Sequence, residues 1–294
     1  MNSRWMIAQG RTVLTAGAVL AVLLLAGGWL FSHPISVSAN QSVILLPAAM
    51  YHSVTDAGDS PAQYVISPSM LESDLQYLQA HGRETVTVRD LLAYVQDGAA
   101  LPEKPVLLTF DDGYYNNYKY AYPLLKQYGM RAVLSPVASL TERFSQTDEA
   151  EQEAWSYCTG RELREMADSG VFEIQNHSYD FHELKPRKGC LRMAGETAAA
   201  YRQCFLSDTR RAQDLFVSLG IEAPVCYTYP YGAVNAEAQA LTAVCGFSVT
   251  LSCEEGVTAL TRDTACLKGV RRNNRDGRWS SVQFWDALLA QTEG

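Results

Sequence analysis

Short apolar segments alternate with helical segments along the chain from residue 42 onward. The apolar segments that predict strands are residues 42–50, 85–88, 106–109, 132–135, 172–176, 225–229, 247–251 and 267–270. Neighbouring parallel strands need a crossover connection, usually a helix, so this alternation predicts a parallel sheet. Seven or eight such units in one domain predict an α/β barrel that is closed or nearly closed. In such barrels the catalytic residues gather at the carboxyl ends of the strands.

Capping residues mark where the helices begin. Ser67 followed by Pro68 is typical of an N-cap and a first helical residue. A threonine three positions before an acidic residue predicts a capping box at Thr87–Asp90 and at Thr159–Glu162. Further helices are predicted over residues 194–219, 236–244 and 281–289, whereas the polar and acidic residues 141–157 are expected to form a surface insertion.

A charge-free run near the N-terminus predicts a membrane anchor. Residues 12–32 hold no charged side chain and are mostly Val, Leu and Ala, over about the length that crosses a bilayer core. Arg4 and Arg11 precede the run, and the first charged residue after it is Asp56. The positive-inside rule then places the N-terminus in the cytoplasm and the bulk of the chain outside.

These boundaries divide the chain into a cytoplasmic tail (1–11), a transmembrane signal-anchor (12–32), a spacer (33–42) and a folded domain (43–294). The expected localisation is the cell membrane, crossed once, with the folded domain on the extracellular face. The alternative is cleavage after Ala39, because residues 37–39 resemble a signal-peptidase site, and the protein would then be secreted.

Charge and cysteine usage exclude some classes of site. The formal net charge is −8 and the pI about 5.2, with no basic stripe, so we expect no nucleic-acid binding. None of the seven cysteines has Cys-x-x-Cys spacing, which argues against a structural zinc site. Cys190 with Cys204, and Cys253 with Cys266, are candidate local disulfides. The sequence does not predict the oligomeric state.

Two adjacent carboxylates, Asp111 and Asp112, follow the apolar segment 106–109. Successive side chains of a strand point to opposite faces, but at the end of a strand, where Gly113 lets the chain turn, both can reach one site. Burying two anions is costly unless a cation or hydrogen bonds compensate. The alternative interpretation is a solvated Asp-Asp-Gly turn.

Two of the five histidines, His177 and His182, directly follow the predicted strand 172–176. Imidazole and carboxylate ligands suit zinc and the neighbouring first-row metals, so the pair and an aspartate could form an Asp-His-His site. Three protein ligands leave positions open for water and substrate, which is typical of a catalytic metal site. Zinc is the default ion, with cobalt, nickel or iron possible at the same ligands. The alternative is two ordinary loop histidines.

A third cluster, residues 227–232, ends the predicted strand 225–229 with the sequence Tyr-Thr-Tyr-Pro-Tyr-Gly. Such a turn could direct a backbone N–H at a developing oxyanion. The alternative interpretation is an ordinary aromatic strand end followed by a turn.

Together the three clusters resemble the polysaccharide deacetylase family, also called carbohydrate esterase family four or the NodB-homology domain. The resemblance covers residues 43–290, and the five-residue histidine spacing resembles the poly-N-acetylglucosamine deacetylases. It implies a distorted (β/α)7 barrel and divalent metal dependence. The roles it implies are general base for Asp111, metal ligand for Asp112, His177 and His182, oxyanion donor for the Tyr231 N–H, and substrate contact for Tyr229, Pro230 and Tyr231.

The sequence departs from the family pattern at two places. Thr228 replaces the arginine that usually opens the third motif, and no histidine follows His182 to act as the late general acid. His52 is the remaining histidine near a predicted strand end and is the candidate for that role. Arg272, in the basic run 271–275, is the candidate for holding Asp111 ionised, as the late arginine of the family does.

The resemblance implies hydrolysis of N-acetyl groups from an N-acetylglucosamine polymer at the cell surface, either peptidoglycan or exopolysaccharide, with release of acetate. Alternatives are an O-acetyl (xylan-type) esterase and a barrel that binds carbohydrate but is catalytically impaired. A metal-free glycoside hydrolase is disfavoured, because its two carboxylates must lie at least about 5 Å apart across a sugar and Asp111 and Asp112 are adjacent.

Overall fold

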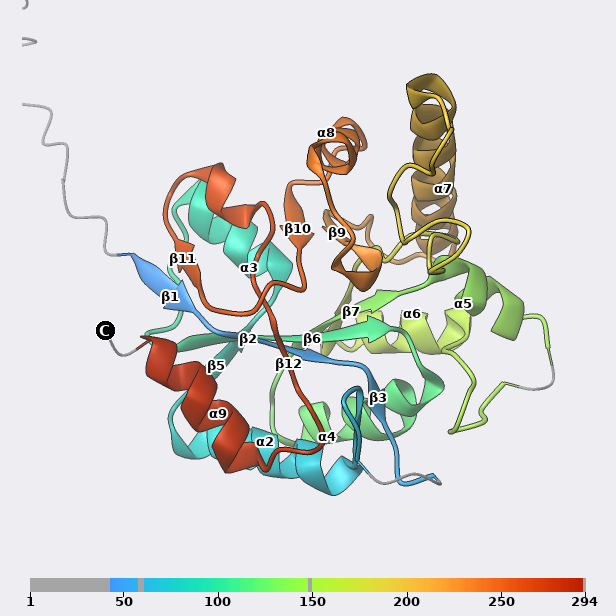
Figure 1. Ribbon diagram of the computed structural model, residues 1–294. Helices are drawn as coiled ribbons and strands as arrows, with labels where there is room; N and C mark the ends of the chain where they lie inside the picture. The colour runs from blue at the N-terminus through green and yellow to red at the C-terminus, as the bar shows by residue number, and fades with distance from the viewer. Residues whose placement is uncertain (1–42, 58–60, 148–149, 293–294) are drawn as a thin grey trace, which may run out of the picture. The chain divides into compact units, whose positions relative to one another are not determined.

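The computed structural model describes residues 43–57, 61–147 and 150–292 (Figure 1). The predicted cytoplasmic tail, signal-anchor and spacer, residues 1–42, lie outside the described residues. Within the described ranges no helix combines the length and hydropathy that a membrane span requires.

The strands are β1 (Ile44–Leu46), β2 (Ala48–Tyr51), β3 (Ser53–Val54), β4 (Val65–Ile66), β5 (Glu84–Val86), β6 (Pro105–Asp112), β7 (Ala132–Pro136), β8 (Phe172–Ile174), β9 (Cys226–Thr228), β10 (Val249–Leu251), β11 (Thr258–Leu260) and β12 (Asn273–Asn274). The α-helices are α2 (Pro68–Ala80), α3 (Val88–Leu92), α4 (Tyr122–Gln127), α5 (Ala138–Phe144), α6 (Gly160–Asp168), α7 (Ala198–Ser218), α8 (Ala236–Val244) and α9 (Ser281–Leu289). Shorter π and 3-10 turns cover Ala93–Asp97, Asn117–Ala121, Pro230–Gly232, Thr264–Leu267 and Ala290–Thr292.

Parallel pairings connect the strands in a closed series. The main sheet has the order β12-β2-β6-β7-β8, and β5 pairs with the start of β6. Asn176, just after β8, bridges in parallel to Tyr227 of β9, which pairs with β10. Leu251 of β10 then bridges to Val270, three residues before β12. The alternation of strands and helices therefore folds as expected of a barrel.

Most predicted helix starts are confirmed. Ser67 accepts a hydrogen bond from the Met70 N–H, and both predicted capping boxes form. Helices α8 and α9 cover the predicted residues. These caps satisfy backbone N–H groups that have no partner inside the helix, which is why they can be recognised from sequence.

Three predictions are corrected. Residues 267–270 are not a strand, because a 3-10 turn occupies Thr264–Leu267 and only Val270 forms a bridge. Residues 141–157 are not wholly a surface insertion, since α5 continues through their first residues and buries Phe144. The predicted single strand 42–50 is two strands, because Pro47 has no N–H for a continuous ladder and separates β1 from β2; β1 pairs antiparallel with β11.

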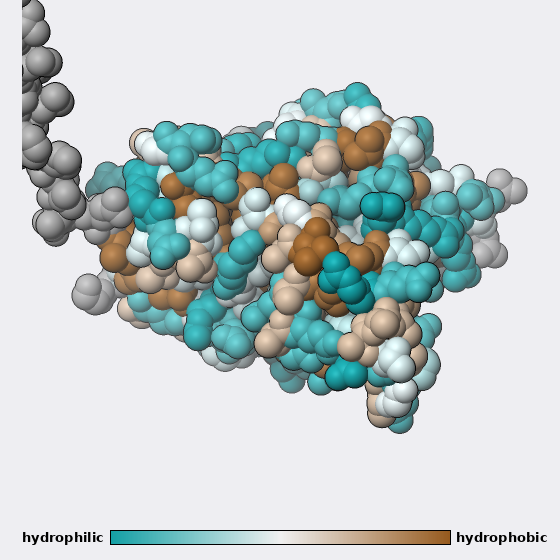
Figure 2. All heavy atoms as spheres, turned by 90° about the horizontal axis from the view of Figure 1, so that it is seen from above, coloured by the Kyte–Doolittle hydropathy of each residue, from teal (hydrophilic) through white to brown (hydrophobic). Residues whose placement is uncertain are grey.

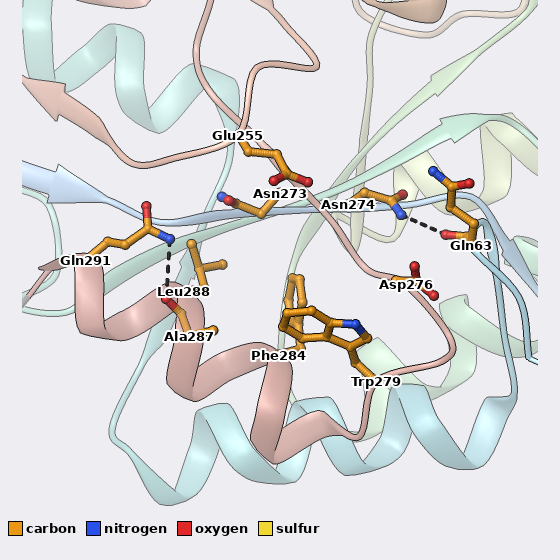
Figure 3. A pocket seen from close by; sticks show the side chains of 10 residues that line it. All are labelled: Gln63, Glu255, Asn273, Asn274, Asp276, Trp279, Phe284, Ala287, Leu288 and Gln291. Atoms are coloured by element: carbon orange, nitrogen blue, oxygen red, sulfur yellow. Dashed lines mark hydrogen bonds between the residues drawn. The ribbon is translucent and has the colours of Figure 1, made fainter.

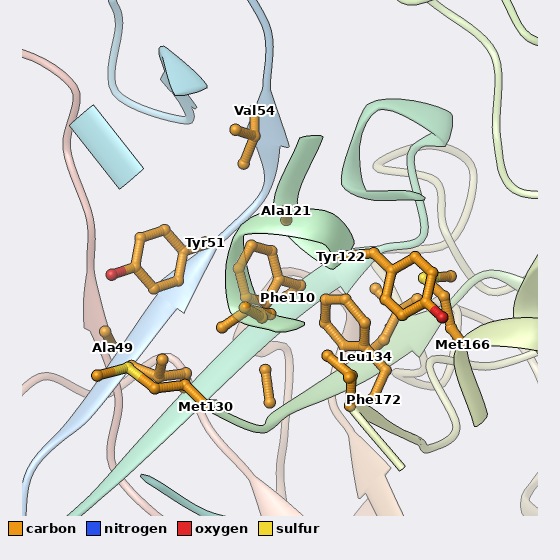
Figure 4. Close-up of a cluster of buried hydrophobic side chains, with 14 of the residues drawn as sticks. Ala49, Tyr51, Val54, Phe110, Ala121, Tyr122, Met130, Leu134, Met166 and Phe172 are labelled. Atoms are coloured by element: carbon orange, nitrogen blue, oxygen red, sulfur yellow. The ribbon is translucent and has the colours of Figure 1, made fainter. Parts of the chain in front are cut away.

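The two faces of β6 bury different sets of side chains. Val106, Leu108 and Phe110 pack in a cluster under α2, α4, α6 and α9, whereas Leu107 packs with Val133 and other residues of a second cluster. Figure 4 shows the first cluster, in which the Phe110 ring stacks on Tyr51 at 4.8 Å and meets Phe172 edge-on at 5.3 Å. The two-residue strand period therefore directs Asp111 to the same face as Leu107.

All seven cysteines are free, which corrects the two candidate disulfides. Cys190 is buried and its thiol donates to the Ala233 carbonyl, whereas Cys204 is exposed on α7. The Cys253 sulfur lies 3.8 Å from the Met50 sulfur, not beside Cys266. Figure 2 shows that hydrophilic residues cover most of the face seen from above, with hydrophobic residues in small groups.

Candidate active site

A buried ion pair lies at the carboxyl end of β6. Asp111 accepts two hydrogen bonds from Arg272, at 2.7 Å from Nη1 and 2.9 Å from Nη2. Arg272 also donates to the Thr109 hydroxyl at 3.1 Å and to the Ser252 carbonyl at 2.9 Å. Burial raises the pKa of Asp111, but the guanidinium charge and its hydrogen bonds outweigh burial and hold that pKa below its usual range. Asp111 is therefore a buried, ionised carboxylate.

The second carboxylate is turned into the same site by unusual backbone geometry. Asp112 has a φ of 70°, in the left-handed region that non-glycine residues rarely adopt. Gly113 follows with a φ of 80°, and a Cβ there would lie 2.5 Å from the Pro136 Cβ. Only glycine permits this close approach, which ends the strand and directs both aspartates to one site.

Asp112 and the two histidines form a compact group. The Asp112 Oδ1 lies 3.0 Å from His182 Nε2 and 3.4 Å from His177 Nε2. One potential ligand atom from each of the three residues lies within 4.8 Å of the others. Burial raises the pKa of Asp112, but hydrogen bonds from His177 and His182 lower it well below its usual range. An ionised carboxylate and two imidazoles at this spacing fit a divalent ion of the zinc class.

A backbone contact orients the first of these histidines. His177 Nδ1 lies 2.8 Å from the Thr228 carbonyl oxygen, so Nδ1 carries the proton and donates it. Its other ring nitrogen, Nε2, faces Asp112 Oδ1 at 3.4 Å and is the atom that could bind a metal ion. Metal-binding histidines are commonly oriented in this way by a carbonyl or carboxylate at the other ring nitrogen. Burial lowers the pKa of His177. The hydrogen bond to Asp112 and the charges of Asp111 and Asp112 raise it by more, so the net pKa shift is upward.

Backbone strain is concentrated in the three motif segments. Asp112, Ser178 and Tyr231 have positive φ values of 70°, 75° and 58°, and Glu151 is the one other non-glycine residue of the described ranges that does. Each such residue costs on the order of 1–3 kcal/mol and persists where surrounding structure enforces it. Such strain is typical of functional sites.

The third motif contributes one of its aromatic side chains to the site. Tyr231 is 42% exposed, its ring stacks on His182 at 4.6 Å, and its hydroxyl donates to the His182 carbonyl at 3.1 Å. Tyr229 is buried and its hydroxyl is hydrogen-bonded to the Thr242 hydroxyl, and Pro230 is buried as well. The structure therefore brings Tyr231 to the site but not the side chains of Tyr229 and Pro230.

His52 lies beside the aspartate pair. Burial lowers the pKa of His52, although the charges of Asp111 and Asp112 raise it. Its Nδ1 is buried and has no hydrogen-bond partner in the described part of the chain. Its ring packs edge-on against Tyr64 at 4.8 Å, and Tyr64 is half-exposed. His52 is therefore a neutral imidazole within the electrostatic reach of both carboxylates.

Thr228, which stands where the family has an arginine, makes two buried polar contacts. It is fully buried, its carbonyl orients His177, and its hydroxyl is 2.7 Å from the Ser135 hydroxyl. The guanidinium beside Asp111 comes instead from Arg272.

The histidine loop is held by a helix that the motifs do not include. Asp208 of α7 accepts hydrogen bonds from the Tyr179 N–H at 2.9 Å and the Asp180 N–H at 2.8 Å. Arg211, one turn further along α7, lies over the Tyr179 ring at 3.8 Å. Burial raises the pKa of Asp208 to about 6. No sequence signal marks Asp208, because α7 also carries Asp214 and neither residue belongs to a motif.

The chain is similar in sequence to known deacetylases. The profile of the family described as "Polysaccharide deacetylase" matches residues 98–250, just over half of the chain. The YxkH protein of Bacillus subtilis (strain 168) is 28% identical over 227 residues, which cover 77% of this chain and 71% of that protein. A poly-beta-1,6-N-acetyl-D-glucosamine N-deacetylase of Staphylococcus aureus (strain NCTC 8325 / PS 47) is 27% identical over 195 residues. That match covers 65% of this chain and 62% of the staphylococcal protein, less than two thirds of its length.

Solved structures have the same fold. A de-N-acetylase from Aggregatibacter actinomycetemcomitans superposes with a TM-score of 0.69 at 24% identity, covering 83% of this chain and 100% of that chain. IcaB from Ammonifex degensii superposes with a TM-score of 0.67 at 23% identity, covering 85% of this chain and 98% of that chain. These similarities establish the fold.

Proposed function

Because the chain belongs to the polysaccharide deacetylase family, we propose that it removes N-acetyl groups from an N-acetylglucosamine-containing polysaccharide of the cell surface and releases acetate. One arrangement carries this proposal: the Arg272-paired carboxylate of Asp111 directly precedes Asp112 in the chain, and Asp112 lies between the two histidines. It supplies a base and a metal-ligand set within one small site.

Asp112, His177 and His182 would hold the divalent ion, which when bound polarises water and the acetamide carbonyl. Asp111 removes a proton from the attacking water, whose oxygen forms a bond to the carbonyl carbon. Arg272 keeps Asp111 ionised, so this base is available at neutral pH. Zinc is the default ion; cobalt, nickel and iron suit the same ligands.

Two groups act on the later part of the reaction. The backbone N–H of Tyr231 donates to the developing oxyanion from the strained turn that follows β9. The carbon–nitrogen bond then breaks, and the amine nitrogen takes up a proton as acetate leaves. His52 is the proton carrier we propose, since it is the histidine beside the aspartates that lies outside the metal-ligand group.

The substrate we propose is a poly-β-1,6-linked N-acetylglucosamine exopolysaccharide. The five-residue histidine spacing and the staphylococcal relative, named for that substrate, favour it over peptidoglycan. An O-acetyl ester substrate is the alternative, because the same base and oxyanion donor would cleave an ester.

The charge-free apolar run of residues 12–32 supports a further proposal, that the enzyme is anchored in the membrane with its catalytic domain outside. N-terminal sequencing of the protein recovered from the membrane fraction tests it. An intact N-terminus supports the anchor, whereas a start at Asn40 contradicts it and indicates a secreted enzyme.

Acetate release from β-1,6-linked N-acetylglucosamine oligomers tests the proposed reaction. Asp111→Asn should slow release by about 10²- to 10⁴-fold, whereas Asp97→Asn, at an exposed position, should not. Equal rates for the wild type and Asp111→Asn would contradict the proposal. Parallel assays on peptidoglycan and acetylated xylan identify the substrate class, and glycan binding without acetate release would indicate an impaired binding barrel.

A further inference from the structure

A cavity lies between β12, α9 and the segment before β4. Its volume is about 260 Å³, and its lining includes Gln63, Glu255, Asn274, Asp276, Trp279 and Phe284. Figure 3 shows the rings of Trp279 and Phe284 on the side of α9, with Glu255 and the amide side chains near β12 on the opposite side. The cavity therefore has an aromatic wall and a polar wall, which is the lining of a small-molecule site with a few orienting groups.

Hydrogen bonds fix the backbone of Trp279, which forms part of the aromatic wall. The Trp279 N–H donates to the Asp276 carbonyl at 3.1 Å, and the Trp279 carbonyl accepts from the Arg275 guanidinium at 3.0 Å. The indole is nevertheless 48% exposed. A half-exposed ring beside amide and carboxylate groups suits a pyranose, whose C–H face packs on an aromatic ring while its hydroxyls bond polar groups.

The polar wall favours a ligand that donates hydrogen bonds and carries positive charge. Neither Lys nor Arg lines the cavity, whereas Glu255 and Asp276 do. Asp276 is paired with Arg278, but Arg271 pairs with Glu254 and leaves the Glu255 carboxylate outside any ion pair of the described ranges. The Asn274 Oδ1 is a buried acceptor that has no partner among the described residues. A free carboxylate and an unpartnered acceptor both suit an ammonium or hydroxyl donor.

Side-chain contacts through Tyr64 link Gln63 of the cavity lining to His52 of the candidate active site. The Gln63 amide donates to the Tyr64 hydroxyl at 3.2 Å, and the Tyr64 ring packs on His52 at 4.8 Å. The Gly277 N–H donates to the Ala62 carbonyl at 2.9 Å, and a Cβ at Gly277 would lie 2.0 Å from the Val65 carbonyl oxygen. Glycine there lets the segment that carries Trp279 pack directly against the segment that carries Gln63.

We propose that this cavity binds a deacetylated, cationic glucosamine unit of the same glycan chain whose acetylated units enter the active site. This inference rests on the proposed function, because that reaction produces the amine. Glu255 receives the ammonium group, Trp279 packs on the sugar face, and Asn274 accepts a donor from the sugar. A chain that is already partly deacetylated is then held more tightly than a fully acetylated one.

Binding measured by calorimetry tests the cavity separately from turnover. The probes are a β-1,6-linked glucosamine pentamer and its fully N-acetylated counterpart, both in the Asp111→Asn background, where the acetylated probe stays intact. Glu255→Gln and Trp279→Ala should each weaken glucosamine binding about tenfold, the loss of one charge-assisted or stacking contact. Glu254→Gln is the matched control, since Glu254 is an exposed neighbour that does not line the cavity.

Each outcome has a definite consequence. Binding of the glucosamine pentamer should also weaken when the pH rises through the pKa of its amine, while binding of the acetylated pentamer should not change. Equal affinity for the glucosamine probe in the Asp111→Asn protein with and without Glu255→Gln or Trp279→Ala would overturn the cavity proposal and leave the proposed deacetylase reaction untouched. Absence of acetate release from the wild type, with Glu255-dependent glucosamine binding retained, would overturn the reaction and leave the cavity.

Discussion

Arg272 lies 161 positions after Asp111 in the chain and donates two hydrogen bonds to its carboxylate. Both side chains are buried. Bidentate pairing of this kind fixes the plane of the carboxylate as well as its charge. The proposed base is therefore held ionised and oriented by a single side chain.

Removing this guanidinium should change the pH dependence of catalysis. In Arg272→Met, burial still raises the pKa of Asp111 while the opposing charge is gone, so the base becomes protonated at a higher pH. The acid limb of the kcat/KM profile for acetate release should move up by about 1–3 pH units. Arg272→Lys should move it less, and Arg271→Met, at an exposed neighbour, should not move it. An unchanged acid limb in Arg272→Met would show that Arg272 does not set this ionisation.

The metal content of the protein should depend on Asp112, His177 and His182. We expect elemental analysis of the purified folded domain to find about one divalent ion per chain, and Asp112→Asn or His182→Gln to lose most of it, since each removes one of three ligands. His81→Gln is the matched control, because His81 is an exposed histidine of the α2 C-cap. Full metal retention by Asp112→Asn would rule out this ligand set.

Asp208 should give folding a pH dependence of its own. Burial raises its pKa to about 6 in the folded state, above the unfolded value of about 3.9. Between these values the folded state binds more protons than the unfolded state, so stability falls as the pH rises. The wild type should therefore lose stability relative to Asp208→Asn from about pH 4 to pH 6, measured by urea unfolding. Asp214→Asn, at an exposed position of α7, should show the same pH dependence of stability as the wild type. If the stability of Asp208→Asn also changed with pH as the wild type does, the raised pKa of Asp208 would be refuted.

A second buried ion pair should stabilise the fold. Asp74 of α2 accepts from Arg275 at 2.8 Å and 3.1 Å and from the Tyr51 hydroxyl at 3.1 Å, and both charged side chains are fully buried. Asp74→Ala should lower the free energy of unfolding by about 3–5 kcal/mol, because it leaves a buried guanidinium unpaired.

The exposed pair of Arg164 with Asp168 provides the comparison for that measurement. Asp168→Ala should cost no more than about 0.5 kcal/mol, since exposed pairs contribute little. The double variant Asp74→Leu with Arg275→Met should recover part of the lost stability. If Asp74→Ala lowered the free energy of unfolding by less than about 1 kcal/mol, the ion pair would not stabilise the fold substantially.

The candidate site was predictable where its residues carry local signals. The Asp-Asp-Gly, His-x4-His and Pro-Tyr-Gly motifs each follow a short apolar strand, and parallel strands bring their carboxyl ends to one rim. The substrate contacts predicted for Tyr229 and Pro230 stay predictions; both residues follow β9 and are buried, which no local pattern in the sequence indicates. Asp208 and Tyr64 carry no local signal, because neither belongs to a motif.

What the sequence alone determined is most of the strands, most of the helix starts and the three motif segments, since periodicity, caps and turn residues act over a few neighbouring positions. The tertiary structure decided which guanidinium meets Asp111, which helix holds the histidine loop and where the cavity beside α9 opens. These contacts join residues far apart in the chain, and they depend on how the ring of strands closes and on the register of each pairing. No short-range pattern specifies either of these.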